Sequence, residues 1–519
     1  MDNRNQITII PENINNLTRL QKFELKRNTI INLGNGFSNL WLTGSLDLSY
    51  NQLTSLPDNF GNLIGIKYLD LRNNRLISLS PTFGNLSNLH TLLVKWGANK
   101  LQSLPAWFGS LTQLGNGSYD ATLDLSDQAL SSLPSGFGQF PWLYSLDLSG
   151  NNLTSLPAWF GNMPRMWILK IQNTKRDING NSIGWISWVL PDSFTGMTKI
   201  YQMNLSGNDI TGLGMFLQSN SQNGCYLDLS DNEITSLPET IGSLWIKDIQ
   251  IHTNKLTTLP DSFYKLQLTY LNLDNNIRLT SLPESFSGMI SITKLSMNNT
   301  AIVHLPSGFG KLRNLTELSV VDGELEDLPD SFWQLSKLEK LDLSGGNKIK
   351  YLPENFGDLQ KLTDLNLHGN SLWEDPSKNP IPDSFANLKI TEILLSQNQL
   401  KTIPTSITTM NKVTSIDLGN NKLESLPDGL GNMTKLSQLN LANTLSTYTA
   451  TLSKLPNDFN QLSGKLTELK MNGTNLGNLN RNFDTNSTAQ VWQDNITQDN
   501  KKITITSLGD SWRLIITKE

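Results

Sequence analysis

The chain of 519 residues has little cysteine, little histidine, few charges and no long hydrophobic run. Its single cysteine, Cys225, excludes a disulfide framework and a zinc site built on cysteines. Only 17% of the residues are charged and the net charge is −5, which argues against a groove for nucleic acid. No stretch approaches the roughly 18 consecutive apolar residues that a transmembrane helix needs. We therefore expect neither a nucleic-acid partner nor a transmembrane segment.

What the chain does contain is one repeated unit, Leu-x-x-Leu-x-Leu-x-x-Asn-x-Leu, followed by Leu-Pro-x-x-Phe-Gly-x-Leu. Residues 66–76 (IKYLDLRNNRL) and 362–372 (LTDLNLHGNSL) are typical copies. We count 19 units between Asn28 and Thr474, most often 23 residues apart. Because stacked repeats extend one core in one dimension, the length of the chain does not require several globular domains.

Each part of the unit predicts a local structure. The Leu-x-Leu alternation predicts a short strand, and consecutive strands should pair in parallel about 4.8 Å apart. The next position holds Asn in 13 of the 19 units, and its side-chain amide should satisfy buried backbone groups of the turn. Leu-Pro should start a short 3₁₀ or α segment on the opposite side, where Phe is an apolar plug and Gly a permissive turn.

These units resemble the leucine-rich repeat family over most of the chain. The Leu-Pro-x-x-Phe-Gly form looks like the 23-residue class of Ras-group-like intracellular proteins and of many bacterial proteins. The resemblance implies an α/β repeat solenoid, a right-handed superhelix with a parallel β-sheet on its concave face and short 3₁₀ or α segments on its convex side. It also implies protein recognition as the usual task. The chain has no Cys-rich caps, which argues against the extracellular animal and plant members.

Both ends of the chain depart from the repeat. We predict a solenoid over residues 1–479 and a small β-rich cap over residues 480–519, because KKITITS and WRLIITKE flank a Gly-Asp turn and predict a hairpin. Such a cap would cover the last coil. The start, with polar residues directly after Met1, contains no signal segment. We interpret the protein as bacterial and exported to the cell surface or the medium, with its signal segment removed; a cytoplasmic scaffold is the alternative.

Insertions into the repeat are the first candidates for function, because inserted loops often form the binding face of repeat proteins. Three insertions lie between the Asn turn and Leu-Pro and should project from one rim: residues 175–189, 371–381 and 445–455. Another, near residues 115–122, lies just before the strand. Drift is the alternative explanation, since loop insertions cost little stability. Two tryptophans, Trp185 and Trp188, make the first insertion the most interesting.

Outward-facing strand residues are the second candidates. The first group is a column of aromatic and polar side chains on successive coils, Tyr226, Asp248 and Tyr270, with His252 beside it; recognition hot spots have this composition. The second group is an apolar patch, Leu93, Val94 and Trp96, at a place where neighbouring coils carry Asp and Ser. Together with the two tryptophans of the insertion, the predicted partner-binding residues are Tyr226, Asp248, Tyr270, His252, Trp185, Trp188, Leu93, Val94 and Trp96.

Catalytic chemistry is not expected. Asp recurs at the outward strand position, so that Asp47 and Asp70 should lie about 5 Å apart, as in a retaining glycosidase or a Ca²⁺ site. The repeat, however, places Asp there in any such unit, and an open sheet offers no pocket. His252 and His368 lie five coils apart, roughly 24 Å, so they cannot share a metal or a proton relay. Cys225 should be a partly buried, unreactive thiol.

We therefore predict a non-catalytic monomer without cofactor or metal. Its concave face and insertion rim should bind a protein or glycan partner. The other interpretation with a sequence basis is that the chain is the recognition part of a larger effector.

Overall fold

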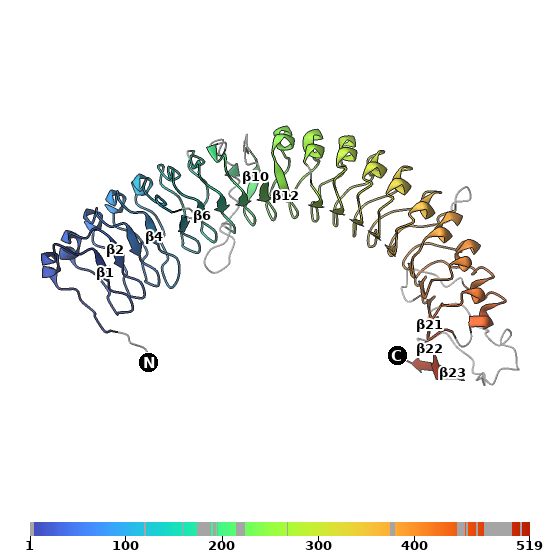
Figure 1. The fold of residues 1–519 in the computed structure, drawn as a ribbon. Coiled ribbons are helices and arrows are strands. Elements are labelled where there is room, and N and C mark those ends of the chain that lie inside the picture. The colour runs from blue at the N-terminus through green and yellow to red at the C-terminus, as the bar shows by residue number, and fades with distance from the viewer. Residues whose placement is uncertain are drawn as a thin grey trace. The chain divides into compact units, whose positions relative to one another are not determined.

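The computed structural model describes residues 5–118, 121–158, 160–173, 188–189, 194, 196–213, 224–266, 268–373, 379–443, 452, 455–462, 465–471, 501–508 and 511–518. The chain divides into two compact units, Met1–Leu256 and Thr257–Glu519. Each unit is a stack of similar coils, with strands along one side and short helical turns along the opposite side (Figure 1). We call these the strand side and the turn side.

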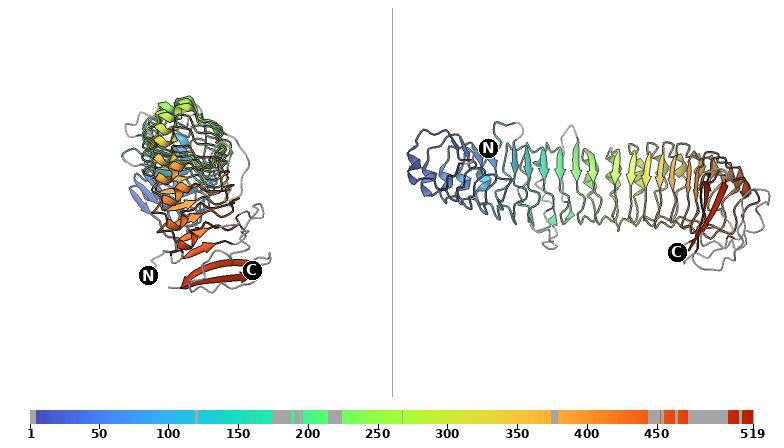
Figure 2. Two further views of the ribbon diagram at one scale, coloured as in Figure 1. Left: turned by 90° about the vertical axis from the view of Figure 1, so that its right-hand side faces the viewer. Right: turned by 90° about the horizontal axis from the view of Figure 1, so that it is seen from below.

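The coil strands of the first unit are three to five residues long and pair in parallel. Strands β1 to β4 form one sheet, and the strands from β5 to β12, without β8 and β10, are successive neighbours in another. The strands lie side by side in the right-hand view of Figure 2. Their bounds are β1 (Lys22–Glu24), β2 (Ser45–Asp47), β3 (Tyr68–Asp70), β4 (Thr91–Leu93), β5 (Thr122–Asp124), β6 (Ser145–Asp147), β7 (Ile168–Lys170), β9 (Gln202–Asn204), β11 (Cys225–Asp228) and β12 (Ile246–Gln250).

The second unit continues the pattern. Its coil strands are β13 (Tyr270–Asn272), β14 (Lys294–Ser296), β15 (Glu317–Ser319), β16 (Lys340–Asp342), β17 (Asp364–Asn366), β18 (Glu392–Leu394), β19 (Ser415–Asp417), β20 (Gln438–Asn440) and β21 (Glu468–Lys470). Strand β22 (Lys501–Leu508) pairs antiparallel with both β21 and β23 (Ser511–Lys518), at the place where the sequence predicts a hairpin. The two units together contain one coil strand for each of the 19 predicted repeats. The division of the chain at residue 479 stays a prediction.

One small sheet was not predicted. Strand β8 (Trp188–Val189) pairs in parallel with β10 (Ile210–Gly212), apart from the coil strands. The backbone of Trp188, which we expected in a projecting loop, is therefore in a strand, because the end of the insertion finds a backbone partner in the following coil.

The helical turns are 3₁₀ throughout the described residues, which is one of the two forms predicted. Their bounds are η1 (Glu12–Asn16), η2 (Asn35–Asn39), η3 (Phe60–Asn62), η4 (Phe83–Asn85), η5 (Phe108–Ser110), η7 (Glu239–Ser243), η8 (Asp261–Lys265), η9 (Glu284–Gly288), η10 (Phe309–Lys311), η11 (Phe332–Gln334), η12 (Phe356–Asp358), η13 (Asp383–Asn387), η14 (Thr405–Thr409), η15 (Leu430–Asn432) and η16 (Phe459–Leu462). Proline stands just before the turn: Pro260 is extended, and its carbonyl accepts the N–H of Phe263 at 3.0 Å.

The Phe-Gly pair holds neighbouring coils together. The rings of Phe60 and Phe83 are fully buried and stack 6.2 Å apart, as do those of Phe309 and Phe332 in the second unit. The glycine that follows is required for a different reason from the one we expected. Gly61 does not have a positive φ; instead, a Cβ there would overlap the backbone of the next coil.

The Asn position performs its predicted role. In the coil of β12, the side-chain amide of Asn254 donates to the carbonyls of Leu229, Ile251 and His252 at 2.9, 3.2 and 3.2 Å. Its oxygen accepts the N–H of Ile234 at 3.0 Å. One side chain thus bonds four backbone groups of two adjacent coils. In the described part of the chain, no helix has the length and hydropathy to cross a bilayer.

Candidate binding surface

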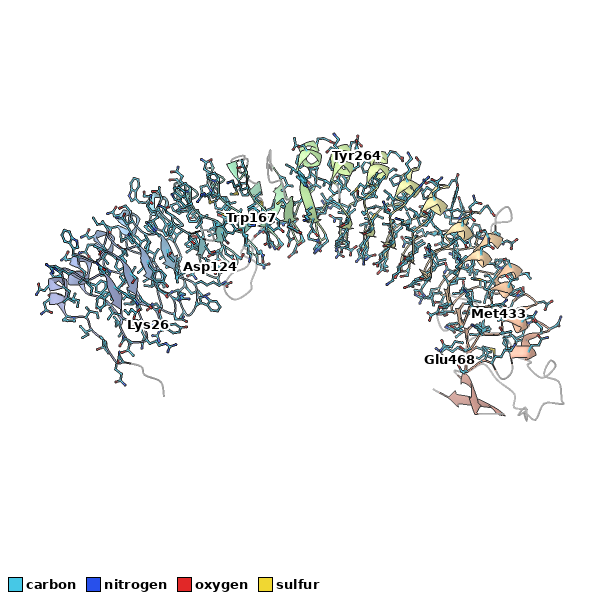
Figure 3. All side chains as sticks on the ribbon, in the orientation of Figure 1. Lys26, Asp124, Trp167, Tyr264, Met433 and Glu468 are labelled. Carbon is cyan, nitrogen blue, oxygen red and sulfur yellow. The ribbon has the colours of Figure 1, made fainter. Side chains whose placement is uncertain are left out.

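A column of stacked aromatic side chains runs along the strand side of the first unit. Tyr144, Trp167 and Tyr201 are the residues directly before β6, β7 and β9, and Tyr226 lies in β11. The ring centroids are 6.0 Å apart for Tyr144 and Trp167 and 4.9 Å apart for Trp167 and Tyr201. Tyr226 meets Tyr201 edge-on at 5.1 Å. We call these four residues the aromatic ladder; Figure 3 labels Trp167.

The backbone of the repeat builds this ladder. The carbonyl of Tyr144 accepts the N–H of Trp167 at 2.8 Å, and the carbonyl of Trp167 accepts the N–H of Tyr201 at 2.9 Å. These bonds fix the three residues in one register on adjacent coils. The spacing between parallel strands, about 4.8 Å, is close to the distance at which aromatic rings stack.

The ladder presents ring edges rather than ring faces. Tyr144 and Trp167 are within 12° of parallel, and Trp167 and Tyr201 are within 17°. The faces between them are therefore covered, while the side chains remain half-exposed. A hydrogen bond with Tyr226 raises the pKa of Tyr201, so the Tyr201 phenol stays protonated at neutral pH. The surface combines apolar area with hydrogen-bonding groups, as protein interfaces do.

A β-bulge ends the ladder. Cys225 pairs with Ile246 whereas Tyr226 pairs with Asp248, so Lys247 is the extra residue. Its ammonium lies 5.8 Å from the centre of the Tyr226 ring. Bulges turn side chains away from the regular pleat, and they are frequent at functional sites.

The first predicted column is partly present. Tyr226, which is 37% exposed, lies opposite Asp248, whose carboxylate accepts a hydrogen bond from Gln250 at 2.7 Å. His252 is half-buried, with Nδ1 3.2 Å from the hydroxyl of Thr253. Tyr270 belongs to the second unit, where it lies opposite Lys294. Sequence reasoning missed the other ladder members, although each stands two residues before an inward Leu or Met.

The predicted apolar patch needs a correction. Val94 is 1% exposed and takes an inward core position, so it cannot contact a partner. The coil has two additional residues after Val94, because the amide of Asn99 bonds a carbonyl five residues back rather than the usual three. This extension leaves Trp96 65% exposed, with a φ of 93°, and Leu93 half-buried.

The insertion rim is mostly outside the described residues. That is true of Trp185, of the side chain of Trp188, and of residues 374–378 and 444–451. Their part in binding stays a prediction.

The aspartates of the strand side complete the backbone turn. Asp47 and Asp70 are direct neighbours, as predicted. The carboxylate of Asp47 accepts the N–H and the hydroxyl of Ser49 at 3.0 and 2.6 Å. Asp70, which we expected to point outward, is only 1% exposed and pairs with the guanidinium of Arg72 at 2.6 Å. The Asp column therefore belongs to the scaffold.

One group in the second unit brings together the residue types of a hydrolase triad. Nδ1 of His368 lies 2.8 Å from the hydroxyl of Ser396, which donates to Asp417 at 2.8 Å. In a catalytic triad the histidine lies between the other two residues and takes the proton of the serine. Here the buried serine lies in the middle and its proton points to the aspartate, so its oxygen is not activated.

The single cysteine is also part of the scaffold. Burial raises the pKa of the Cys225 thiol to about 12, so it stays protonated at neutral pH. Within the residues that the structure describes, no cluster of three His, Cys, Asp or Glu side chains could hold a metal ion.

The comparisons with known proteins agree with this architecture. Sequence models of the leucine-rich repeat family match residues 313–372, 382–445, 45–63, 65–86, 142–163, 225–244 and 267–289. No curated protein sequence matches the chain.

Three solved structures illustrate the likeness. The Arabidopsis receptor kinase HAESA, solved with the peptide hormone IDA and a co-receptor, is 23% identical, with a TM-score of 0.50 over 89% of this chain and 83% of that chain. Toll in the Drosophila Toll–Spatzle complex is 20% identical, with a TM-score of 0.54 over 81% and 56%. A Leptospira interrogans leucine-rich repeat protein is 24% identical, with a TM-score of 0.43 over 83% and 93%. The chain is a leucine-rich repeat protein.

Proposed function

We propose that this protein is a non-catalytic binding protein, and that its first unit holds a protein partner along the aromatic ladder. The leucine-rich repeat fold suits protein interaction. Two proteins of this fold, HAESA and Toll, were solved in complexes with a peptide hormone and with Spatzle. Neither likeness identifies a partner for this chain.

The observation that carries the proposal is the ladder itself. Tyr144, Trp167, Tyr201 and Tyr226 lie on four adjacent coils and are already ordered by stacking. Tyr and Trp are enriched among the residues that dominate binding energy, because they offer a large contact area with few rotatable bonds. Their order in the unbound protein lowers the entropy that binding must overcome.

The same geometry favours a protein over a glycan. Sugar rings bind aromatic side chains through the ring faces, and here the faces between neighbours are covered. Ring edges, phenol hydroxyls and an indole N–H suit the polar backbone and side chains of a peptide. A glycan ligand is thus the weaker of the two alternatives.

Location is a separate proposal. We propose that the protein is bacterial and acts outside the cell or on its surface, with a cytoplasmic scaffold as the alternative. Immunodetection in fractionated cells of the source organism distinguishes the two. Detection in the cytoplasmic fraction alone would refute export.

Binding can be tested with the full chain immobilised against a displayed library of protein fragments and, in parallel, a glycan array. Tyr201→Ala and Tyr226→Ala should each weaken the selected protein ligand about tenfold, a loss of about 1.4 kcal/mol. Trp107→Ala is the matched control, because Trp107 is 70% exposed just before η5 on the turn side. Thermal unfolding of each variant shows whether the fold is intact. Unchanged affinity in both tyrosine variants, or ligands found only on the glycan array, would refute the proposal.

A further inference from the structure

Three cations border the aromatic ladder. Arg165 and Lys199 stand two residues before Trp167 and Tyr201, and so occupy the same place on adjacent coils. Both are exposed, as is Lys247 at the bulge. The guanidinium of Arg165 lies 4.8 Å from the centre of the Trp142 ring, which extends the aromatic surface by one side chain.

These cations are available to a ligand. Among the residues that the structure describes, no carboxylate lies within ion-pairing distance of any of the three. Arg72 and Lys294, by contrast, are paired internally, with Asp70 and Glu317. The edge of the ladder therefore carries positive charge that the fold does not neutralise.

The aromatic rings add to this positive electrostatic potential. An aromatic ring is negative over its faces and positive at its edge. In the ladder, stacking covers part of the faces of neighbouring rings, which leaves the ring edges as the part that an anion can approach. An anion placed along the ladder would meet the edges of Trp167 and Tyr201 together with the neighbouring ammonium and guanidinium groups.

Carboxylates limit this positive edge on its other side. Three aspartates lie within strands: Asp147 is three residues after Tyr144, Asp228 is two residues after Tyr226, and Asp248 pairs with Tyr226. Asp147 accepts the N–H of Ser149, and Asp228 accepts the N–H of Ser230, each at 3.0 Å, while Asp248 bonds Gln250. The positive strip is thus narrow. Lys170 is the direct neighbour of Asp147 in this row, so the row is mixed in charge. A broad polyanion would still overlap the carboxylates, whereas a single extended strand fits beside them.

The chemistry of the rings also argues against single-stranded nucleic acid. Proteins that hold single strands offer free aromatic faces on which bases stack. The faces within the ladder are occupied, and the whole chain has a net charge of −5. An extended peptide rises about 3.3 Å per residue, so about five residues cover four coils spaced about 4.8 Å apart.

Building on the proposed function, we infer that the ladder binds an extended acidic segment of a protein partner, with its carboxylates facing Arg165, Lys199 and Lys247. Charge complementarity of this kind sets specificity and the rate of association. The attraction between these exposed charges also weakens as the salt concentration rises.

The test is selection of random 12-residue displayed peptides on the full chain, followed by fluorescence anisotropy with the selected peptides. Asp and Glu should be enriched in a stretch of about five residues. The triple variant Arg165→Glu, Lys199→Glu, Lys247→Glu should lower the affinity at least tenfold, and high salt should act in the same direction. A control with the same change in net charge, Lys340→Glu, Lys389→Glu, Lys435→Glu, alters exposed lysines of the second unit and should have less than a twofold effect.

The remaining outcomes separate this inference from the proposed function. Selected peptides that are not acidic, and that respond to Tyr201→Ala but not to the triple reversal, would overturn the inference and leave the ladder as a binding surface. Peptides that respond to neither change would overturn both. Failure to select any peptide, or displacement of the acidic peptide from the ladder by a heparin oligosaccharide or by oligo-dT at lower concentration, would overturn the inference.

Discussion

The residue directly before each coil strand is aromatic at three successive coils of the first unit and carries a hydroxyl in most coils of the second. In the second unit, the hydroxyl of Thr293 donates to the carbonyl of Thr269 at 2.8 Å, and that of Thr316 donates to the carbonyl of Thr293 at 3.0 Å. In the first unit, Tyr144 and Trp167 stack in this position. The same place in the repeat thus serves a local hydrogen bond in one unit and forms a surface in the other.

The backbone explains why both solutions are compatible with the fold. The N–H of Tyr144 donates to the carbonyl of Ala121 at 3.0 Å, as the N–H of Thr293 donates to that of Thr269 at 2.8 Å. These bonds join the coils whatever the side chain is. The position is therefore free to vary, and the backbone bonds do not explain why it is aromatic in the first unit.

The largest expected effect tests whether the two units share one coil spacing. A Cβ added at Gly61 or Gly357 would overlap the backbone of the next coil, at Thr82 or Ser384. Gly61→Ala and Gly357→Ala should each lower the free energy of unfolding by about 3 kcal/mol, because the coils must separate. Urea denaturation measures the loss.

Two other glycines are controls for this substitution. A Cβ at Gly136 or Gly346 would come no closer than 3.9 or 3.7 Å to its nearest neighbour. Gly136→Ala and Gly346→Ala should change the stability by less than about 1 kcal/mol. Equal losses in all four variants would contradict the role given to the Phe-Gly pair.

The next prediction compares Asn and Thr at the Asn position of the repeat. Asn254 of the first unit satisfies four backbone groups, whereas Thr300 of the second donates to the carbonyl of Met297 alone, at 2.9 Å. Asn254→Ala leaves several buried groups without partners and should cost about 2–3 kcal/mol, whereas Thr300→Ala should cost about 1 kcal/mol. Urea denaturation of the two variants measures both losses of stability. A larger loss for Thr300→Ala would show that the hydrogen bonds do not set the difference.

Much of this fold could be predicted because it follows from contacts within one repeat and its neighbour. The strands, the Asn turn and the 3₁₀ segments each have a fixed residue pattern. Val94 was misassigned although the repeat places it inward, because Leu92 and Val94 take the positions of Leu69 and Leu71. The two additional residues that follow it are revealed only by the partner of Asn99. The bulge at Lys247 depends in the same way on pairing with the preceding strand.

The candidate surface was harder to predict than the fold. The sequence drew attention to Tyr226 and Tyr270, which stand out within their strands. It did not bring out Trp167, because residues before the strand vary without affecting the pattern. The arrangement of His368, Ser396 and Asp417 likewise depends on pairing across coils.

An exchange of residues between the units tests the surface directly. Trp167→Thr removes two stacking contacts and should cost about 1–2 kcal/mol of stability. It should also abolish binding of the peptides selected on the intact chain. The reverse change, Thr316→Trp, should create no binding in the second unit, because a single ring lacks stacked neighbours and adjacent cations. Anisotropy with the same peptides measures both variants. Full binding by Trp167→Thr would remove the ladder from consideration.

The smallest effect concerns the hydroxyl column of the second unit. Thr316→Val keeps the shape of the side chain and removes its hydrogen bond to the carbonyl of Thr293. That carbonyl still accepts the N–H groups of Thr316 and Glu317, at 2.7 and 3.1 Å. No acceptor is left unsatisfied, so the loss should be only about 0.5 kcal/mol. Ser437→Ala, which removes a 3.1 Å bond to Thr414, should behave alike. A loss above about 2 kcal/mol in either variant would mean that the hydroxyls hold these coils together. Aromatic residues could not then replace them at this position without a loss of stability.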